Sequence, residues 1–250
     1  MKKIKVVVPI SGGKDSQACL ILALMEFNSD EVLGLFCDTK NEHPLTYAHI
    51  EKMKELYGVE IKTINAGTVY EKVIKHKRWP GGGARHCTDE LKITPSKVFY
   101  RELAKNQNDG FQVWLGMRTQ ESHERNKRYS NKINTELYEP HEILSKYPAY
   151  LGKLGIRFRL PVVDFSSNEI YSLIGDNLNP LYRLGFTRVG CAPCFASAPR
   201  DILKYFALDE FGKQQRIKSD EVGEIIGRKC LPIKDEITDD LFGGCGFCSI

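Results

Sequence analysis

The chain has 250 residues, of which 42% are hydrophobic and 27% charged, and its formal net charge is +4. This composition is typical of a soluble globular protein, and the length suffices for one large domain, or one domain with an appendage. No apolar stretch reaches the roughly 20 residues of a membrane span, and the apolar run behind the basic first residues is too short for a signal peptide. We therefore expect a cytoplasmic protein with no membrane partner. The mild positive charge requires no nucleic-acid partner, although it would help to hold polyanions.

The first part of the chain alternates strand and helix patterns. Val6–Ile10 is a β-branched apolar run, as in a buried parallel strand, and residues 17–27 are apolar almost all round, as in a buried helix. The alternation continues through residues 31–39, 45–58, 60–66 and 69–75. It predicts right-handed βαβ units, and hence a three-layer, doubly wound α/β fold with a mostly parallel sheet.

The second part of the chain is less regular. Residues 76–88 are basic and glycine-rich, which we interpret as a lid or ligand clamp, and residues 119–150 form a long polar connection. The remaining predictions are strands at residues 111–118 and 157–163, and helices that begin at Thr94, span residues 166–177 with Ser167 as cap, and span residues 200–211 and 213–226. We therefore predict an α/β domain over residues 1–184 and a Cys-rich helical C-terminal region over residues 185–250 that packs on it.

Six residues, Ser-Gly-Gly-Lys-Asp-Ser, join the first strand to the first helix at positions 11–16. Two glycines without Cβ let the backbone turn sharply and approach a ligand closely. The free N–H groups at the helix N-terminus face an anion, and Lys14 adds a mobile charge. An ordinary glycine turn is the alternative, but the complete set at a strand-to-helix junction favours a phosphate site.

The spacing of these six residues differs from the common nucleotide motifs GxxxxGK[ST] and GxGxxG. It resembles the pyrophosphate loop of the N-type ATP pyrophosphatases, which split ATP between the α and β phosphates. The resemblance implies that ATP with Mg²⁺ binds through Ser11, Gly12, Gly13, Lys14, Asp15 and Ser16. Lys14 would neutralise phosphate charge, and Asp15 or Asp38 would hold the metal.

Further motifs follow in the order found in the phosphoadenosine phosphosulfate (PAPS) reductase family. Asp38 and Thr39 begin a stretch similar to DTGxxFPET, and residues 87–95 resemble CTxxLKxxP. Residues 116–125 are similar to GxRxxESxxR, and NPLYxxG and RxGCxxC follow at residues 179–185 and 188–194. The resemblance covers roughly residues 5–194 and implies an adenine nucleotide alpha-hydrolase-like fold.

The same resemblance assigns roles to the motif residues. Contacts to the nucleotide are implied for Asp38, Thr39, Arg85, Lys92, Gly116, Met117, Arg118 and Glu121. Arg118 and Arg125 would neutralise charge on the departing pyrophosphate, although a solvated charge run is the plainer interpretation. Lys40 departs from the family, which often has Gly there, so the backbone path at this position is open.

Cys87 is the cysteine that we consider for catalysis. It is flanked by Arg85 and His86, and positive neighbours would lower the pKa of its thiol. It would serve as a sulfur carrier or a cluster ligand; a half-buried bystander is the alternative.

Two CxxC pairs, Cys191/Cys194 and Cys245/Cys248, lie in the C-terminal region, with Cys230 between them. Eight cysteines without a secretion signal indicate thiol or metal chemistry rather than disulfides. The pairs predict a four-thiolate site for zinc or a [4Fe–4S] cluster, and the family resemblance favours the cluster. Reduced redox thiols are a third possibility, and Cys19 and Cys37 belong to the core.

The resemblance implies an enzyme, and three functions stay open. The first is an ATP pyrophosphatase that adenylates an acceptor for sulfur transfer, with the ATPase of DNA phosphorothioation and the small subunit of ATP sulfurylase as the most similar members. The second is a PAPS or adenylylsulfate reductase with a cysteine nucleophile, and the third a non-catalytic nucleotide-binding subunit. The sulfur donor and acceptor and the oligomeric state are not readable from the residues. A nucleic-acid acceptor is possible, because residues 76–85 and 125–132 are basic.

Overall fold

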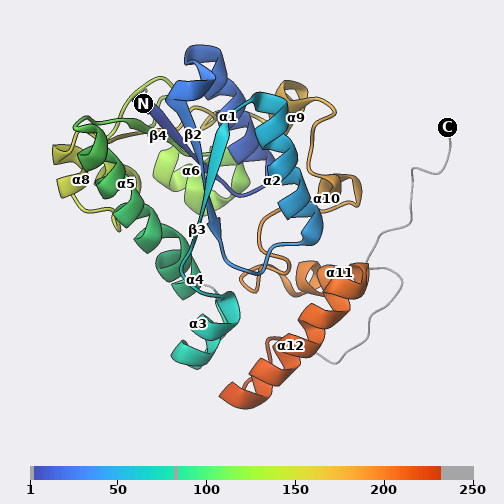
Figure 1. Ribbon diagram of the computed structural model, residues 1–250. Coiled ribbons are helices and arrows are strands. Elements are labelled where there is room, and N and C mark those ends of the chain that lie inside the picture. The colour runs from blue at the N-terminus through green and yellow to red at the C-terminus, as the bar shows by residue number, and fades with distance from the viewer. Residues whose placement is uncertain (1–2, 82–83, 232–250) are drawn as a thin grey trace, which may run out of the picture.

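A computed structural model describes residues 3–81 and 84–231 (Figure 1). Its centre is a parallel sheet in the order β3-β2-β1-β4-β5. The strands are β1 (Val6–Ile10), β2 (Val32–Asp38), β3 (Glu60–Asn65), β4 (Gln112–Trp114) and β5 (Arg157–Arg159). The chain moves outward from β1 in one direction and then in the other, which is the topology of a doubly wound sheet. The predicted fold class is confirmed.

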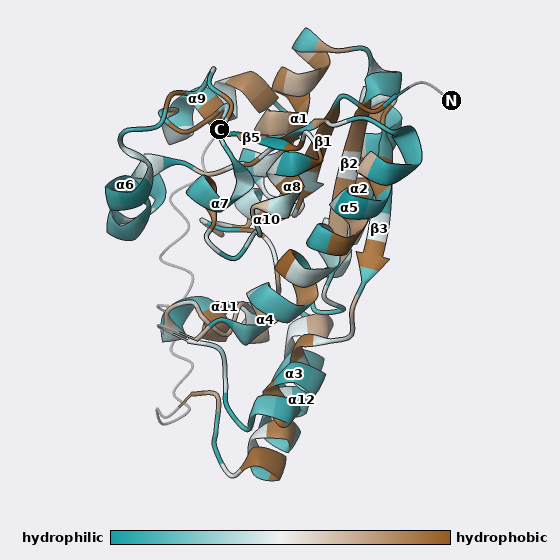
Figure 2. Cartoon of the chain, turned by 90° about the vertical axis from the view of Figure 1, so that its left-hand side faces the viewer, coloured by the Kyte–Doolittle hydropathy of each residue, from teal (hydrophilic) through white to brown (hydrophobic). Residues whose placement is uncertain are grey.

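Helices cover both faces of this sheet, so the central strands β1 and β2 are buried almost throughout, whereas the edge strand β3 is partly exposed (Figure 2). Val6 and Val8 of β1 pack toward α1 (Lys14–Glu26), α2 (Pro44–Tyr57) and α9 (Ser167–Ile174). Val7 packs in the opposite direction, because successive strand residues alternate between faces. The helices on that side are α5 (Thr94–Gln107), α6 (His123–Tyr129), α7 (Pro140–Ile143) and α8 (Tyr150–Lys153).

The C-terminal helices pack beyond the carboxyl ends of the strands (Figure 1). They are α11 (Pro199–Leu208) and α12 (Glu210–Ile226), and they follow the short α10 (Pro180–Arg183). With α3 (Val69–His76) they bury an apolar cluster that includes Tyr70, Val73, Phe195, Phe206 and Val222. The two helices therefore pack on α3, and the division into an α/β domain and a C-terminal region at residue 184 stays a prediction.

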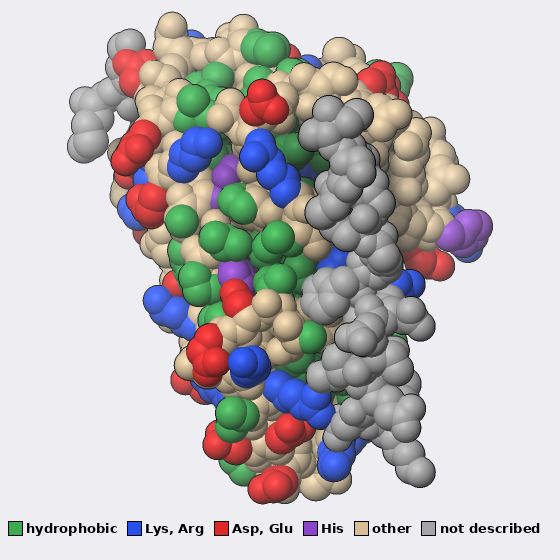
Figure 3. All heavy atoms as spheres, turned by 90° about the vertical axis from the view of Figure 1, so that its right-hand side faces the viewer, with side chains coloured by type: hydrophobic (Ala, Val, Ile, Leu, Met, Phe, Trp, Pro, Cys, Tyr) green, Lys and Arg blue, Asp and Glu red, His purple; other side chains and the backbone are tan. Residues whose placement is uncertain are grey.

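A second small cluster joins α10 and α11 to the start of α2. Leu181, Phe186 and Tyr205 are buried in it, and the rings of Phe186 and Tyr205 are stacked with centroids 4.1 Å apart. On the face drawn in Figure 3, hydrophobic side chains gather near the middle, with basic and acidic ones around them. Among the described residues, no helix is both long and apolar enough to cross a membrane.

Several element boundaries differ from the predictions. Helix α1 begins at Lys14 rather than at residue 17, so the charged half of the loop belongs to its first turn. Ser166, not Ser167, caps α9: its Oγ accepts from the Glu169 N–H, and the Glu169 carboxylate accepts from the Ser166 N–H. These two reciprocal hydrogen bonds form a capping box, which needs Glu three residues after the capping Ser, and Glu169 has that spacing from Ser166 but not from Ser167.

The other differences concern the second half of the sheet. Strands β4 and β5 end at residues 114 and 159, earlier than predicted, and after β4 the chain passes close to the backbone of Asp15 at Gly116. The polar connection at residues 119–150 contains α6, α7 and the start of α8. Before α5, α4 (His86–Thr88) and a π-helical turn (Asp89–Ile93) already wind the chain, so the helical path begins before the predicted Thr94.

Candidate functional site

The glycine loop (residues 11–16) lies at the carboxyl end of β1, where α1 begins. Its two serines hold its shape. The Oγ of Ser16 donates to the carbonyl oxygen of Gly13 at 2.8 Å and accepts from the Ser11 N–H at 3.2 Å. The Oγ of Ser11 accepts from the Gly13 N–H at 3.3 Å. The loop is therefore organised by its own hydrogen bonds before any ligand binds.

Two glycines at this site are required by close packing. Gly12 has a φ of +73°, and a Cβ there would lie 2.4 Å from Cγ2 of Thr46. At Gly116 a Cβ would lie 2.8 Å from the carbonyl oxygen of Asp15. Gly12 thus lets the loop approach α2, and Gly116 lets the segment after β4 approach α1, more closely than any larger residue allows.

Lys14 is buried at the loop, with only 6% of its surface exposed. Its Nζ lies 3.7 Å from Oδ2 of Asp15, beyond hydrogen-bond distance. The ring centroids of Tyr182 and Tyr171 are 5.4 and 5.8 Å from Nζ. Burial lowers the pKa of Lys14, and the charge of Asp15 opposes that shift. A buried ammonium so weakly neutralised is a strong potential anion ligand.

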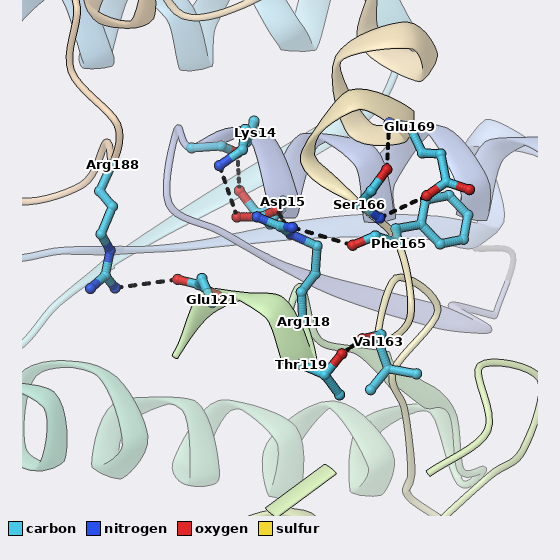
Figure 4. Close-up of polar contacts among 12 residues, drawn as sticks. Lys14, Asp15, Arg118, Thr119, Glu121, Val163, Phe165, Ser166, Glu169 and Arg188 are labelled. Atoms are coloured by element: carbon cyan, nitrogen blue, oxygen red, sulfur yellow. Dashed lines mark hydrogen bonds and ion pairs between the residues drawn. The ribbon is translucent and has the colours of Figure 1, made fainter. Parts of the chain in front are cut away.

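Arg118 reaches the same helix turn from the segment after β4 (Figure 4). It is 3% exposed, and its Nε donates to Oδ1 of Asp15 at 2.5 Å, while its Nη1 donates to the carbonyl oxygen of Phe165 at 3.2 Å. Next to it, Met117 packs against the core cluster on the α5 side. The guanidinium is thus committed to Asp15, and this geometry makes Arg118 a residue that positions the Asp15 carboxylate.

Glu121 lies between two arginines. Arg125, four residues on, forms an ion pair with it, and Nη2 of Arg188 lies 3.4 Å from Oε1 (Figure 4). The side chain of Arg188 is 61% exposed, so its guanidinium is open to solvent. Two guanidinium groups held at one carboxylate keep a positive surface next to the glycine loop.

The glycine loop is covered by residues 179–189, which we call the covering segment. Nδ2 of Asn179 donates to the carbonyl oxygen of Gly12 at 3.0 Å, and the Lys14 N–H donates to the hydroxyl of Tyr182 at 2.9 Å. A Cβ at Gly13 would lie 2.9 Å from the carbonyl oxygen of Val189. Sequence reasoning did not name Asn179, Tyr182 or Arg188 as site residues, although the NPLYxxG and RxGCxxC motifs contained the signal.

Asp38 ends β2 at the same sheet edge. It accepts hydrogen bonds at Oδ1 from the Lys40 N–H at 2.8 Å and from the Tyr47 hydroxyl at 2.7 Å, and Nζ of Lys40 lies 2.8 Å from Oδ2. Burial acts to raise the pKa of Asp38, but these bonds outweigh it and bring the pKa below its usual value. Lys40 has a φ of +56°, the left-handed conformation that Gly adopts most easily, which settles the backbone path left open above.

A second group, which we call the thiol site, consists of Thr39, Glu42, Lys92 and Cys191. The Sγ of Cys191 lies 3.4 Å from the Thr39 hydroxyl and 3.8 Å from Oε1 of Glu42. The Thr39 hydroxyl also donates to Oε1 of Glu42 at 2.8 Å. Burial raises the pKa of Glu42, and it raises the pKa of Cys191 to about 12. Cys191 is therefore a neutral thiol at pH 7.

Lys92 comes to the thiol site from the π-helical turn and not to the glycine loop. Its charge interacts with Cys191, Glu42 and Cys194, and its pKa lies above the usual value. Lys92 thus provides the positive charge of this site.

The expectation for the Cys87 thiol is wrong. Burial raises its pKa, and a nearby Cys194 raises it further, whereas the attraction of Lys92 is the smaller effect. Desolvation outweighs the basic neighbours because the thiol packs against the apolar cluster around α3. Arg85 is exposed and directly precedes α4.

The predicted metal ligands are tested only in part. Cys245 and Cys248 lie outside the described residues. Cys191 and Cys194 have the right chemistry for a thiolate site, and Cys87 is near Cys194. Within residues 3–81 and 84–231, however, no three or more His, Cys, Asp or Glu side chains are arranged to hold a metal. The donors described do not complete a cluster or zinc site, and we derive no step through one. Cys19 and Cys37 are buried in the core, as predicted.

Solved structures with similar backbones were found by comparison. One is the phosphate complex of a phosphoadenylyl-sulfate (PAPS) reductase from Candida auris, with a TM-score of 0.48 and 17% identity over 75% of this chain and 81% of that one. Another is the U34-tRNA thiolase NcsA from Methanococcus maripaludis with its [4Fe-4S] cluster, with a TM-score of 0.45 and 16% identity over 90% and 68%.

Relatives were also found by sequence. A protein of Methanocaldococcus jannaschii, uncharacterized by name, is 31% identical over 77% of this chain, which covers 37% of the relative. A phage 186 protein is 25% identical over 80% of this chain and 70% of its own length. The chain thus spans little more than a third of the first of these relatives. Residues 5–197 match the family described as the phosphoadenosine phosphosulfate reductase domain. With more than three quarters of its residues matched, this chain belongs to the PAPS reductase domain family.

Proposed function

We propose that the protein is an ATP pyrophosphatase that adenylates an acceptor, releasing pyrophosphate, for sulfur transfer. The observation that carries the proposal is the buried Lys14 ammonium at the start of α1, beside a self-organised glycine loop. Membership in the PAPS reductase family supports an adenine nucleotide as ligand. An intact Lys in this loop favours ATP cleavage over reduction of a sulfonucleotide.

The residues around the loop divide the work of binding and stabilisation. The N–H groups of the loop and Lys14 hold the β and γ phosphates, and they neutralise charge that develops on the leaving pyrophosphate. Arg188 and Arg125 extend this positive surface, while Arg118 fixes the Asp15 carboxylate. The acceptor oxygen attacks the α phosphorus, the bond to the bridging oxygen breaks, and the leaving pyrophosphate takes that electron pair.

Magnesium enters this scheme as part of the Mg·ATP substrate. Asp15 and Asp38, the carboxylates expected at the metal, are each bound by a basic side chain, Arg118 and Lys40. The pair does not form a ready cation site, and no step is assigned to it. Cys191 and Cys194 would supply two of the thiol donors of the predicted [4Fe–4S] or zinc site, and no step of the reaction is assigned to that site.

A product assay tests the proposal. ATP labelled at the α phosphate is incubated with the protein and Mg²⁺, alone and with sulfate, tRNA or DNA, and the products are separated. AMP or an adenylated acceptor with pyrophosphate supports the proposal. ADP with phosphate contradicts it. Sulfite released from PAPS with thioredoxin identifies the reductase instead, and tight binding without turnover under all conditions identifies a non-catalytic subunit.

A further inference from the structure

The first helical N–H of α1 does not point into open space. The Lys14 N–H donates to the hydroxyl oxygen of Tyr182 at 2.9 Å, and a Cβ at Gly13 would lie 3.3 Å from that same oxygen. In a helix that binds an anion, this N–H is one of the groups that faces it. Here a side-chain hydroxyl from the covering segment occupies the place of an anion oxygen.

The Tyr182 hydroxyl keeps a proton of its own to donate. It accepts the Lys14 N–H, and within the described residues its hydrogen has no acceptor at hydrogen-bond distance. Burial raises the pKa of Tyr182, so the hydroxyl stays protonated at neutral pH. Accepting a hydrogen bond polarises an O–H group and strengthens it as a donor. The hydroxyl is thus a donor prepared by the helix N-terminus.

The same side chain contacts Lys14 a second time. The Lys14 Nζ lies 5.4 Å from the Tyr182 ring centroid, and its carboxylate neighbour, Asp15, is 3.7 Å away. Lys14 is more than nine-tenths buried, yet it makes no hydrogen bond to Asp15 at that distance. The buried Lys14 ammonium and the unused proton of the Tyr182 hydroxyl therefore lie next to each other, and together they mark the space that an anion would fill.

We infer that Tyr182 is a phosphate-binding residue. Its oxygen accepts the hydrogen bond of the Lys14 N–H, and its own O–H donates to an oxygen of the pyrophosphate portion of the nucleotide. The hydroxyl thus links the helix N-terminus to the phosphate. This role rests on the proposed function and deepens it. It also explains why the covering segment closes on the loop: the segment supplies a ligand as well as a lid on Gly13.

The opposite arrangement makes a different prediction. If the hydroxyl only fills the anion position and must leave before phosphate binds, its removal should strengthen binding. Tyr182→Phe keeps the ring and removes the hydroxyl, so it separates the two arrangements. Tyr171→Phe is the matched control, because its ring also lies near Lys14, at 5.8 Å, while the Tyr171 hydroxyl makes no hydrogen bond with the glycine loop.

Isothermal titration calorimetry of the full chain with inorganic pyrophosphate, ATP and AMP tests the inference. We expect Tyr182→Phe to weaken pyrophosphate and ATP binding by about tenfold, the effect of one lost hydrogen bond to a charged group. AMP binding, and all binding by Tyr171→Phe, should change by less than about twofold. A fluorotyrosine at position 182, which keeps the shape and donates more strongly, should restore or exceed the original affinity.

The outcomes separate this inference from the proposed function. Unchanged or tighter pyrophosphate binding by Tyr182→Phe overturns the role of Tyr182, and so does an equal loss of AMP affinity, which indicates a merely structural effect. If the original protein binds neither ATP nor pyrophosphate, the proposed function fails first, and the role of Tyr182 fails with it.

Discussion

The glycine loop and the thiol site lie at the same edge of the sheet but are built differently. The glycine loop is charged, and its cations are held by nearby carboxylates, as in the Asp15–Arg118 and Glu121–Arg188 pairs. The thiol site is buried, and burial raises the pKa of both Cys191 and Glu42 above their usual values. The loop is thus prepared for a polyanion, whereas the thiol site needs a deprotonating partner, such as a metal, to become reactive.

One stretch of chain connects the two regions. Arg188 contacts Glu121 beside the loop, and three residues later Cys191 forms an isolated antiparallel β-bridge with Glu42, in the segment that follows β2. The Ala192 N–H donates to the carbonyl oxygen of Asn41 at 2.6 Å, which fixes this stretch to the sheet edge. A substitution in this stretch can therefore disturb the glycine loop alone, the thiol site alone, or both.

The largest effect is expected from Gly12→Ala. A Cβ at this position would lie 2.4 Å from Cγ2 of Thr46, in a backbone conformation that alanine adopts poorly. We expect a loss of at least about 2 kcal/mol of stability and no measurable pyrophosphate binding. Urea unfolding and calorimetry measure both.

Gly58→Ala is the matched control. It has a comparable φ of +57° but nothing within 4 Å of the added Cβ, so only conformational strain remains. If both variants lose equal stability and both still bind pyrophosphate, the close packing at Gly12 does not shape the loop.

The next effect is on the pH dependence of folding stability, and it comes from a histidine that contacts α1, the helix behind the loop. His49 is buried, with Nε2 3.0 Å from Oε1 of Gln17 on α1, and burial lowers its pKa to about 4. The unfolded chain protonates near pH 6.5 but the folded one does not, so stability present above pH 6.5 falls as the pH approaches 4. This amounts to up to about 3 kcal/mol. Urea unfolding of His49→Gln should show a flatter pH dependence over that range; an unchanged dependence contradicts the assignment.

A smaller effect is expected from Arg188→Ala. Because this guanidinium is exposed beside the loop, its loss should weaken pyrophosphate binding by about tenfold, or ~1.4 kcal/mol, with little change in stability. Arg183→Ala in the same covering segment is the control, since its Nη2 donates to the carbonyl oxygen of Asp176. Equal losses in the two variants would mean that net charge alone, and not the position of Arg188, attracts the anion.

The smallest effect on phosphate binding is expected from Cys191→Ala. If the two regions are separate, pyrophosphate affinity should stay within about twofold, while iron or zinc in anaerobically purified protein falls sharply. Elemental analysis and calorimetry measure the two quantities. Unchanged metal content would remove Cys191 from the ligand set.

The sequence predicted local features well and non-local ones poorly. The strand, loop and helix around residues 11–16 depend on neighbouring residues, so Val6–Ile10 was predicted with its correct bounds. Tyr182 reaches Lys14 across 168 positions, and only the folded chain reveals that contact. The pKa of Cys87 was misjudged for the same reason, because the sequence shows its charged neighbours but not its burial.

The most direct test of the account is phosphorus NMR of Mg·ATP with the original protein and with Lys14→Met, which keeps the packing between the tyrosine rings but removes the charge. The account predicts AMP and pyrophosphate from the original protein in the presence of the correct acceptor, and a loss of at least about a hundredfold in rate for the variant. Formation of ADP and phosphate, or an unchanged rate in Lys14→Met, would contradict it.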